Sequence, residues 1–223
     1  MNDPLVTRLH YCSLLAYCPV STTQDGEKAK KIMRAIKNDL PIRTSRFGEL
    51  FASELIAEIL KTDWEAFFLD FLREDHILVP MPRSSPIRRG ALWPSFRIAH
   101  AMEQQSLGRV RSLIKRITHV PKSSLVPPGQ RPTPTIHYES MAVTSKLSVS
   151  PKTKIILVDD IITRGHTFMG AAWRLKRAFP KAEIKAFAAM RTVSNESEFK
   201  GLIDPVIGQI TYRPESDDCL RRP

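Results

Sequence analysis

The sequence predicts an α/β protein with a central, mainly parallel sheet flanked by helices. Two short aliphatic runs, residues 76–81 (HILVPM) and 154–158 (KIILV), lack polar alternation, as expected for strands covered on both faces. The second run is followed by a helical pattern over residues 166–179 and by another strand-like run over residues 183–190. A strand, a helix and a strand joined by short links predict a right-handed βαβ unit.

The chain length and composition predict one globular domain. Its 223 residues suffice for one sizeable core, and 42% hydrophobic with 26% charged residues is typical of a globular protein. We divide it into a helical or hood region (1–75), a core (76–192) and a C-terminal tail (193–223). The sequence contains neither an apolar run of about 18 residues nor a secretory signal. We therefore expect no membrane association and a cytoplasmic location.

The remaining elements are predicted from hydrophobic spacing and from proline. Residues 1–26 are expected to be irregular, and residues 121–134 hold five prolines, which predicts a long loop. The other expected elements are helices over 27–38, 49–61 and 93–105, a helical continuation over 64–72, a basic loop over 82–90 and strands over 111–117 and 205–212.

The cysteines and the net charge limit the compartments and partners that are possible for the protein. Three cysteines (Cys12, Cys18 and Cys219) without CxxC spacing argue against a disulfide framework and favour a reducing compartment. A metal site formed by Cys12, Cys18 and His10 is the weaker interpretation, because zinc sites usually have shorter spacings and a fourth ligand. The net charge of +11 indicates an anionic partner, whether nucleic acid, a membrane surface or a phosphorylated small molecule.

The segment over residues 155–167 (IILVDDIITRGHT) carries the most specific chemistry. Asp159 and Asp160 stand at the carboxyl end of a predicted parallel strand, which is the edge where open α/β sheets bind ligands. The following turn enters a helix, whose free N–H groups and dipole favour a phosphate. The two carboxylates suit the vicinal hydroxyls of a ribose, so the segment predicts a sugar-phosphate site.

Three residues of the turn strengthen this prediction. Gly165 allows a close backbone approach or a positive φ, and Thr163 and Thr167 add hydroxyl donors. A strand ending in two aspartates also occurs in response-regulator receivers and in Walker B strands. Receivers carry the acids on their first strand, and Walker B needs a GxxxxGK[ST] partner that this sequence lacks.

The same segment resembles the phosphoribosyl-diphosphate (PRPP) signature of type I phosphoribosyltransferases, in which four apolar residues, two acids and a Thr/Gly-rich turn follow one another. Arg164 and His166 are bulkier than the residues common there. A second piece, VPMPRSSPIRRG over residues 79–90, resembles the ComF-like branch of that family. The resemblance covers roughly residues 76–192 and implies a type I phosphoribosyltransferase-like fold with a small variable hood.

The resemblance implies a magnesium-dependent transferase that uses PRPP or a related ribose phosphate. A nucleophilic acceptor, which the sequence does not identify, would displace diphosphate from C1 of the ribose. The implied roles are ribose hydroxyl and Mg²⁺ binding by Asp159 and Asp160; 5′-phosphate binding by Thr163, Arg164, Gly165, His166 and Thr167; diphosphate binding by Arg83, Ser84 and Ser85, with Arg88 and Arg89 as weaker candidates; and contacts from a mobile loop by Lys115, Arg116 and Lys122.

Two alternatives to an active transferase stay open. One is a catalytically weak PRPP- or nucleotide-binding regulatory protein, or a ComF-like protein related to DNA uptake. The other is an accessory protein that binds nucleic acid through its basic charge. The chain lacks the cysteine-rich zinc element common in ComF-like proteins, and its loop over residues 121–141 departs from their pattern. The resemblance also leaves a homodimer open.

Overall fold

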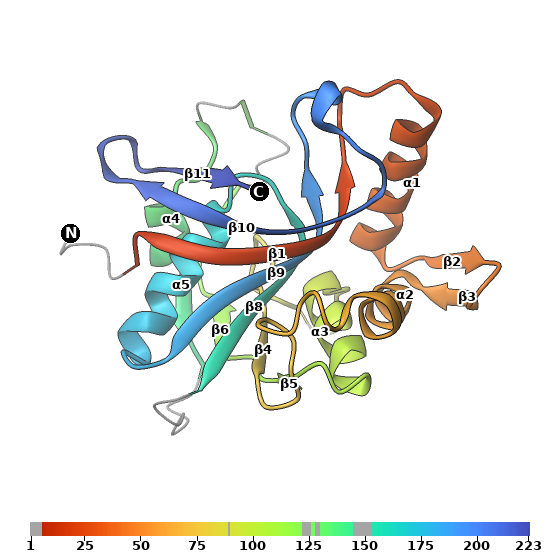
Figure 1. The fold of residues 1–223 in the computed structure, drawn as a ribbon. Helices are drawn as coiled ribbons and strands as arrows, with labels where there is room; N and C mark the ends of the chain where they lie inside the picture. Colours follow the sequence, from red (N-terminus) through yellow and green to blue (C-terminus); the bar gives the residue numbers. More distant parts are fainter. Residues whose placement is uncertain (1–5, 89, 122–125, 128–129, 145–152) are drawn as a thin grey trace.

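A computed structural model shows a seven-stranded sheet with helices on both faces (Figure 1). The structure describes residues 6–88, 90–121, 126–127, 130–144 and 153–223. The strands lie in the order β11-β10-β1-β9-β8-β4-β5. Their bounds are β1 (Arg8–Tyr17), β4 (Ile77–Pro80), β5 (Arg109–Val110), β8 (Lys154–Ile162), β9 (Glu183–Thr192), β10 (Ile203–Arg213) and β11 (Asp218–Arg222).

Most of the sheet is parallel. The strands β1, β9, β8, β4 and β5 run in the same direction, whereas β10 is antiparallel to β1 and β11 is antiparallel to β10. The prediction of an α/β fold with a mainly parallel sheet flanked by helices is therefore confirmed.

Helices cover both faces of the sheet. One face packs against α1 (Gln24–Asn38), α2 (Ala52–Ile59), a π-helix (Leu60–Trp64) and α3 (Pro94–Gln104). The other packs against α5 (His166–Ala178), which carries α4 (Pro134–Glu139) and the small hairpin of β6 (Ile114–Arg116) and β7 (Met141–Val143). The hairpin of β2 (Pro41–Thr44) and β3 (Gly48–Phe51) projects beside α2 (Figure 1), and the tail includes short 3-10 helices at Glu196–Glu198 and Pro214–Ser216.

The strand β8 explains why its sequence has no polar alternation. Ile156 and Val158 belong to the hydrophobic cluster beneath α1, α2 and α3, whereas Ile155 and Leu157 belong to the cluster beneath α5. All four side chains are fully buried. A strand covered on both faces must be apolar at every position, so the uninterrupted aliphatic run marks the centre of the sheet.

The connections define a topological switch point between β4 and β8. The crossover through α3 leads from β4 outward to β5, and the crossover through α5 leads from β8 in the opposite direction to β9. Right-handed crossovers in opposite directions place α3 and α5 on opposite faces, as their separate hydrophobic clusters show. The carboxyl ends of β4 and β8 therefore flank the crevice where open α/β sheets bind ligands.

The prediction that residues 1–26 are irregular is wrong. Arg8–Tyr17 forms β1, which lies inside the sheet between β9 and β10. Its residues Tyr11–Ala16 are buried on both faces, so the strand shows no alternation, and the flanking prolines and polar residues hid it. The C-terminal tail also forms two strands of the same sheet, so both ends of the chain extend the core instead of forming only a hood.

Three further boundaries differ from the prediction. The helix expected over residues 49–61 begins at Ala52, because β3 ends at Phe51, whose N–H donates to the Glu54 carboxylate (2.9 Å). The helical continuation over residues 64–72 is a π-helix ending at Trp64, followed by turns. The strand expected over residues 154–158 continues to Ile162, because pairing with β9 continues beyond the acids.

Replacing Phe187 by alanine tests the shared core. Phe187 is fully buried on β9 and packs edge-on against Phe68 with ring centroids 6.5 Å apart. We expect Phe187→Ala to lower the free energy of unfolding by about 3–5 kcal/mol in urea denaturation. The control Ile203→Ala, at a side chain 54% exposed on β10, should change it by less than about 0.5 kcal/mol. A cost at Phe187 as small as the control's would contradict this packing.

Candidate functional site

An open pocket of about 420 Å³, solvent included, lies at the carboxyl end of β8. Its walls come from β8, from the turn that follows it, from the start of α5 and from one residue of the proline-rich loop. The lining residues are Arg131, Asp159, Ile161, Ile162, Thr163, Arg164, Gly165, His166, Thr167 and Phe168. The structure thus brings Asp159 and all five predicted phosphate-turn residues to one pocket, at the switch-point edge of the sheet.

The turn depends on Gly165, which caps α5 in a left-handed conformation with φ of 93°. A Cβ at this position would lie 2.7 Å from Cδ1 of Ile210 on β10, so only glycine fits between the turn and the strand. Gly165 offers no side chain to the first N–H groups of α5. These amides and the helix dipole face the pocket and favour an anion there.

Asp159 and Asp160 are adjacent residues of β8, and both are half-buried. Oδ1 of Asp159 accepts hydrogen bonds from the Ser95 hydroxyl (2.8 Å) and from the Asp160 backbone N–H (2.9 Å). Ser95 lies in the first turn of α3, so the helix that follows β4 holds the acid of β8. Asp160 does not line the pocket, and its Oδ1 accepts from the Ile161 N–H (2.8 Å).

The carboxyl pair carries an electrostatic conflict. Desolvation, the neighbouring charge of Asp160 and a hydrogen bond with its carboxyl raise the pKa of Asp159 well above its ordinary value. Hydrogen bonds from Ser95 and from the Asp160 amide oppose this shift. A cation or the hydroxyl donors of a ligand would stabilise the charged form of Asp159.

The predicted diphosphate loop starts beside β8 and is closed by a hydrogen bond of its own arginine. The Met81 N–H donates to the Val158 carbonyl (2.8 Å), which joins the end of β4 to β8. Arg83 is exposed, and its Nη1 donates to the Leu92 carbonyl (2.7 Å) at the other end of the loop. Arg83, Ser84 and Ser85 do not line the 420 Å³ pocket, so they would meet a ligand that extends beyond it.

Two neighbours of this loop were not predicted from the sequence. Ser85 Oγ lies 2.8 Å from Nδ1 of His119, and the Ser84 carbonyl accepts from the Val120 N–H at 2.8 Å. The segment after β6 therefore holds both serines. A local motif in the sequence does not signal this contact, since the partners are more than thirty positions apart.

Arg116, expected on a mobile loop, is a buried residue of β6. Its Nε donates to the Arg83 carbonyl (2.9 Å) and its Nη1 to the Ser140 hydroxyl. Desolvation lowers its pKa to about 10, against the opposing effect of the Asp159 charge. Arg116 thus supports the diphosphate loop from beneath and lies near enough to Asp159 to feel its charge.

The other basic candidates are at the surface or outside the described residues. Lys115 and Arg88 are exposed. Lys122 and Arg89 lie outside the residues that the structure describes.

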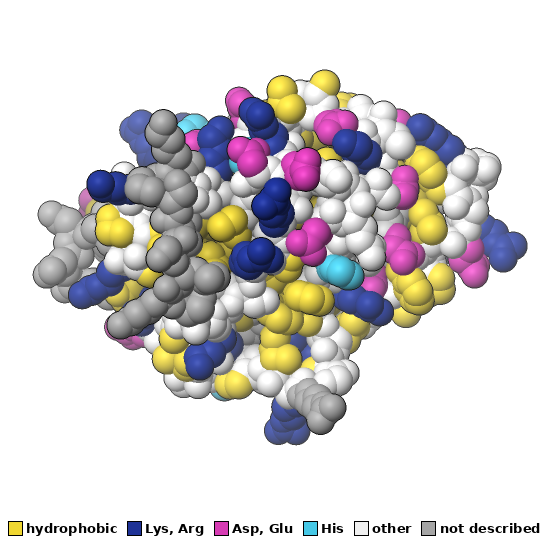
Figure 2. Space-filling model, turned by 90° about the horizontal axis from the view of Figure 1, so that it is seen from below, with side chains coloured by type: hydrophobic (Ala, Val, Ile, Leu, Met, Phe, Trp, Pro, Cys, Tyr) yellow, Lys and Arg dark blue, Asp and Glu magenta, His cyan; other side chains and the backbone are white. Residues whose placement is uncertain are grey.

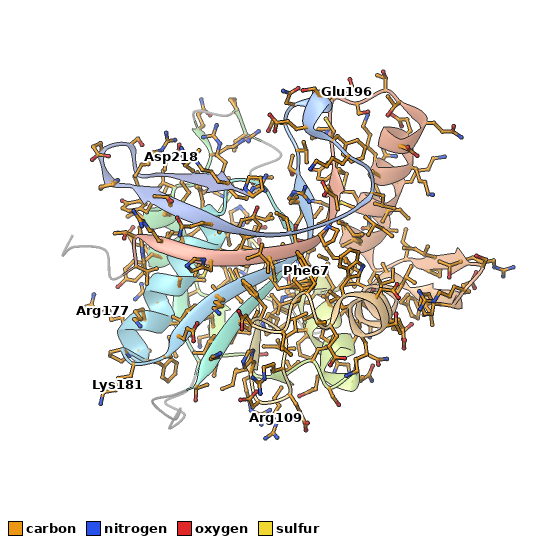
Figure 3. The ribbon with its side chains drawn as sticks, in the orientation of Figure 1. Phe67, Arg109, Arg177, Lys181, Glu196 and Asp218 are labelled. Atoms are coloured by element: carbon orange, nitrogen blue, oxygen red, sulfur yellow. The ribbon has the colours of Figure 1, made fainter. Side chains whose placement is uncertain are left out.

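Asp218 at the start of β11 is an unpredicted partner of the phosphate turn. Its carboxylate faces Nε2 of His166 (2.6 Å), Nη1 of Arg164 (3.3 Å) and the guanidinium of Arg213. Burial would raise the pKa of Asp218, but hydrogen bonds from His166, the Cys219 amide and Arg213 lower it to about 2. Figure 3 shows Asp218 near the top of the view, on the edge strand β11 of the sheet, and Arg177 near the other end of α5.

Arg221 of β11 holds the other side of the turn. Its Nε donates to the Thr163 carbonyl (2.6 Å), its Nη1 to the Tyr11 hydroxyl (2.8 Å) and its Nη2 to the Thr192 carbonyl. One guanidinium therefore links the turn to β1 and β9. Together with Ile210 and Asp218, it makes the C-terminal hairpin the back wall of the pocket.

The residues present fit a magnesium ion that shares its coordination with a substrate. The described part of the chain has no cluster of three or more His, Cys, Asp or Glu that could hold a metal by itself, and Cys12 and Cys18 are buried free thiols. Magnesium usually binds proteins through one or two carboxylates and completes its shell with water and substrate phosphates. Asp159 and Asp160 supply such a pair.

Comparison with known proteins gives no family. No model of a known protein family matches the chain, and a comparison with curated proteins gives no match. None of the helices in the described ranges has both the length and the apolar character needed to cross a membrane.

Asp159→Asn should stabilise the protein at neutral pH. Because the folded-state pKa of Asp159 is raised, its protonated form contributes stability that is complete near pH 4 and lost as pH rises through that pKa. Asparagine keeps the Oδ1 acceptor for Ser95 and removes the charge. We expect a gain on the order of 1–3 kcal/mol at pH 8 that shrinks toward pH 4 in thermal unfolding. The substitution Asp70→Asn at an exposed aspartate is the control. An equal gain in stability for both variants would contradict the claim that the charge of Asp159 destabilises the folded state.

Gly165→Ala should destabilise the protein by about 1–3 kcal/mol, because alanine is strained at φ of 93° and meets Ile210. A double-mutant cycle with Ile210→Ala separates the two causes. The second substitution should cost less in the Gly165→Ala background, since it relieves the contact. Additive costs measured by urea denaturation would show that the close approach is not the reason for glycine.

Proposed function

We propose that this protein is a type I phosphoribosyltransferase of the ComF-like kind, which binds PRPP with magnesium and transfers its ribose 5-phosphate to an acceptor. The observation that carries the proposal is the pocket at the switch point, where Asp159 lies beside a Gly165-capped helix start. Carboxylates for a sugar diol and amides for a phosphate stand next to each other in the order that the PRPP signature requires.

PRPP would bind at this edge of the sheet in a single orientation. The 5′-phosphate would occupy the cup formed by the turn and the first amides of α5. The ribose hydroxyls would donate to Asp159 and Asp160, and C1 with its diphosphate would point toward the loop of Arg83, Ser84 and Ser85. Arg116 donates to the Arg83 carbonyl in that loop, and Ser95, at the start of α3, donates to Asp159.

In the proposed reaction the acceptor forms a bond to C1 as the bond from C1 to diphosphate breaks, and the bonding electrons leave with the diphosphate. The transition state resembles an oxocarbenium ion, which a nearby carboxylate stabilises. When bound, magnesium would neutralise charge on the diphosphate. Because burial and the neighbouring charge raise the pKa of Asp159, a bound cation or hydroxyl donor would favour its charged form.

The alternative of a nucleic-acid-binding protein would be favoured by a continuous basic surface. On the face shown in Figure 2, Lys and Arg side chains alternate with Asp and Glu side chains and with hydrophobic ones. The described part of this face therefore offers no continuous basic stripe to a nucleic acid.

Calorimetry with PRPP and magnesium tests the proposal. We expect wild type to bind PRPP and Asp159→Asn/Asp160→Asn to lose at least about tenfold in affinity, because two acceptors of the ribose and the metal are removed. The exposed Asp70→Asn variant is the matched control. Equal affinity in the double variant and wild type would reject the assignment of the acids.

Measuring diphosphate release with a panel of nucleophilic acceptors then distinguishes an active transferase from a catalytically weak regulatory protein. Diphosphate release that depends on an acceptor supports a transferase. Tight PRPP binding without release across the panel supports the catalytically weak regulatory alternative. A DNA affinity that falls steeply with salt, without PRPP binding, would replace both with a nucleic-acid-binding function.

A further inference from the structure

We propose that Arg131 completes the phosphate cup and makes the site selective for a terminal phosphomonoester over a phosphodiester. This inference rests on the proposed function and extends it, because Arg131 belongs neither to the strand–turn–helix segment nor to the diphosphate loop. It reaches the pocket from the proline-rich segment, 23 positions before the start of β8 at Lys154.

Arg131 lines the same pocket as Asp159 and the phosphate turn. Its Nε is buried and has no hydrogen-bond partner among the residues that the structure describes. A buried, unpaired donor on a guanidinium is costly, and native proteins rarely keep one without a ligand or an ordered water. The guanidinium of this pocket-lining residue is the group that an oxyanion in the cup would meet.

The backbone around Arg131 is fixed to α5. The carbonyl of Pro132 accepts a hydrogen bond from Nδ1 of His166 (2.9 Å), which is the first residue of α5. The following helix α4 packs on α5 at Gly170, where a Cβ would come within 2.7 Å of the Pro134 carbonyl oxygen. Arg131 therefore does not depend on an induced movement to face the turn.

The other cationic side chains of the pocket are already paired. Arg164 and His166 both contact the Asp218 carboxylate. Nδ1 of His166 lies 2.9 Å from the Pro132 carbonyl oxygen, and its Nε2 lies 2.6 Å from Oδ1 of Asp218. Asp218 also pairs with Arg213.

His137 of α4 adds no charge either. Its Nε2 lies 3.3 Å from the Thr167 hydroxyl, and desolvation together with the charges of Arg116 and His166 lowers its pKa to about 3. It is therefore neutral at physiological pH. Among the described residues that line the pocket, Arg131 is thus the cation without a protein counter-ion.

This arrangement places donors on opposite sides of the cup. The helix amides and the hydroxyls of Thr163 and Thr167 come from the turn, and the guanidinium comes from across the pocket. A phosphomonoester offers three terminal oxygens and nearly two negative charges at pH 7, whereas a phosphodiester offers two oxygens and one charge. With a diester, one side of the cup would keep unpaired donors. A guanidinium fork suits the monoester best.

The test compares ribose 5-phosphate with ribose 5-(methyl phosphate) by calorimetry in magnesium buffer, using the full chain. We expect wild type to prefer the monoester. Arg131→Gln should lose about 10- to 100-fold in affinity for ribose 5-phosphate and lose much less for the methyl diester, so that the preference collapses. The affinity of Arg131→Lys for ribose 5-phosphate should lie between those of wild type and Arg131→Gln, because an ammonium group keeps the charge but lacks the paired donors of a guanidinium.

Arg34→Gln, an exposed arginine of α1, is the control that removes the same charge away from the pocket, and it should bind like wild type. Melting temperatures establish that each variant is folded. If Arg131→Gln and wild type prefer the monoester equally, the role of Arg131 is wrong while the proposed function stands. If wild type binds neither ribose 5-phosphate nor PRPP, the proposed function fails and this inference fails with it.

Discussion

The site depends on a carboxyl group held where its charge is unfavourable. Asp159 stands on β8 directly after residues that are buried on both faces and next to a second aspartate, and both conditions raise its pKa. The Ser95 hydroxyl and one backbone amide oppose this rise. A carboxylate in this position gains little for the fold itself. It becomes favourable when a cation or a set of hydroxyl donors arrives, which is why the pair indicates a ligand.

The phosphate turn is stabilised from behind by the C-terminal hairpin. Ile210 fills the space under Gly165, Asp218 neutralises Arg164 and His166, and Arg221 holds the Thr163 carbonyl. These contacts leave the backbone amides of the helix start facing the pocket, while the nearby cationic side chains are occupied. The turn is therefore held by several contacts from behind, and the selectivity that we propose depends on Arg131, which comes from another part of the chain.

Local sequence patterns predicted much of the site because its chemistry lies within thirteen consecutive residues. The aliphatic run of β8, the two aspartates and the glycine turn follow one another, so strand, acids and helix start are fixed by short-range rules. The same rules failed for β1, whose burial on both faces removes alternation. The spacing predicted a strand over residues 111–117, whereas the family resemblance implied a mobile-loop role for Arg116, which is buried on β6 and supports Arg83.

The sequence by itself determined the α/β class, the βαβ unit and the positions of the acids and the turn, since each follows from spacing along one segment. Only the tertiary structure decided that β1, β10 and β11 extend the sheet and that Ser95, Asp218, Arg221 and Arg131 surround the turn. These partners are separated from the turn by up to 68 positions, from Ser95 to Thr163. Contacts over such distances leave no local pattern, because they are set by which strands pair and which helices pack.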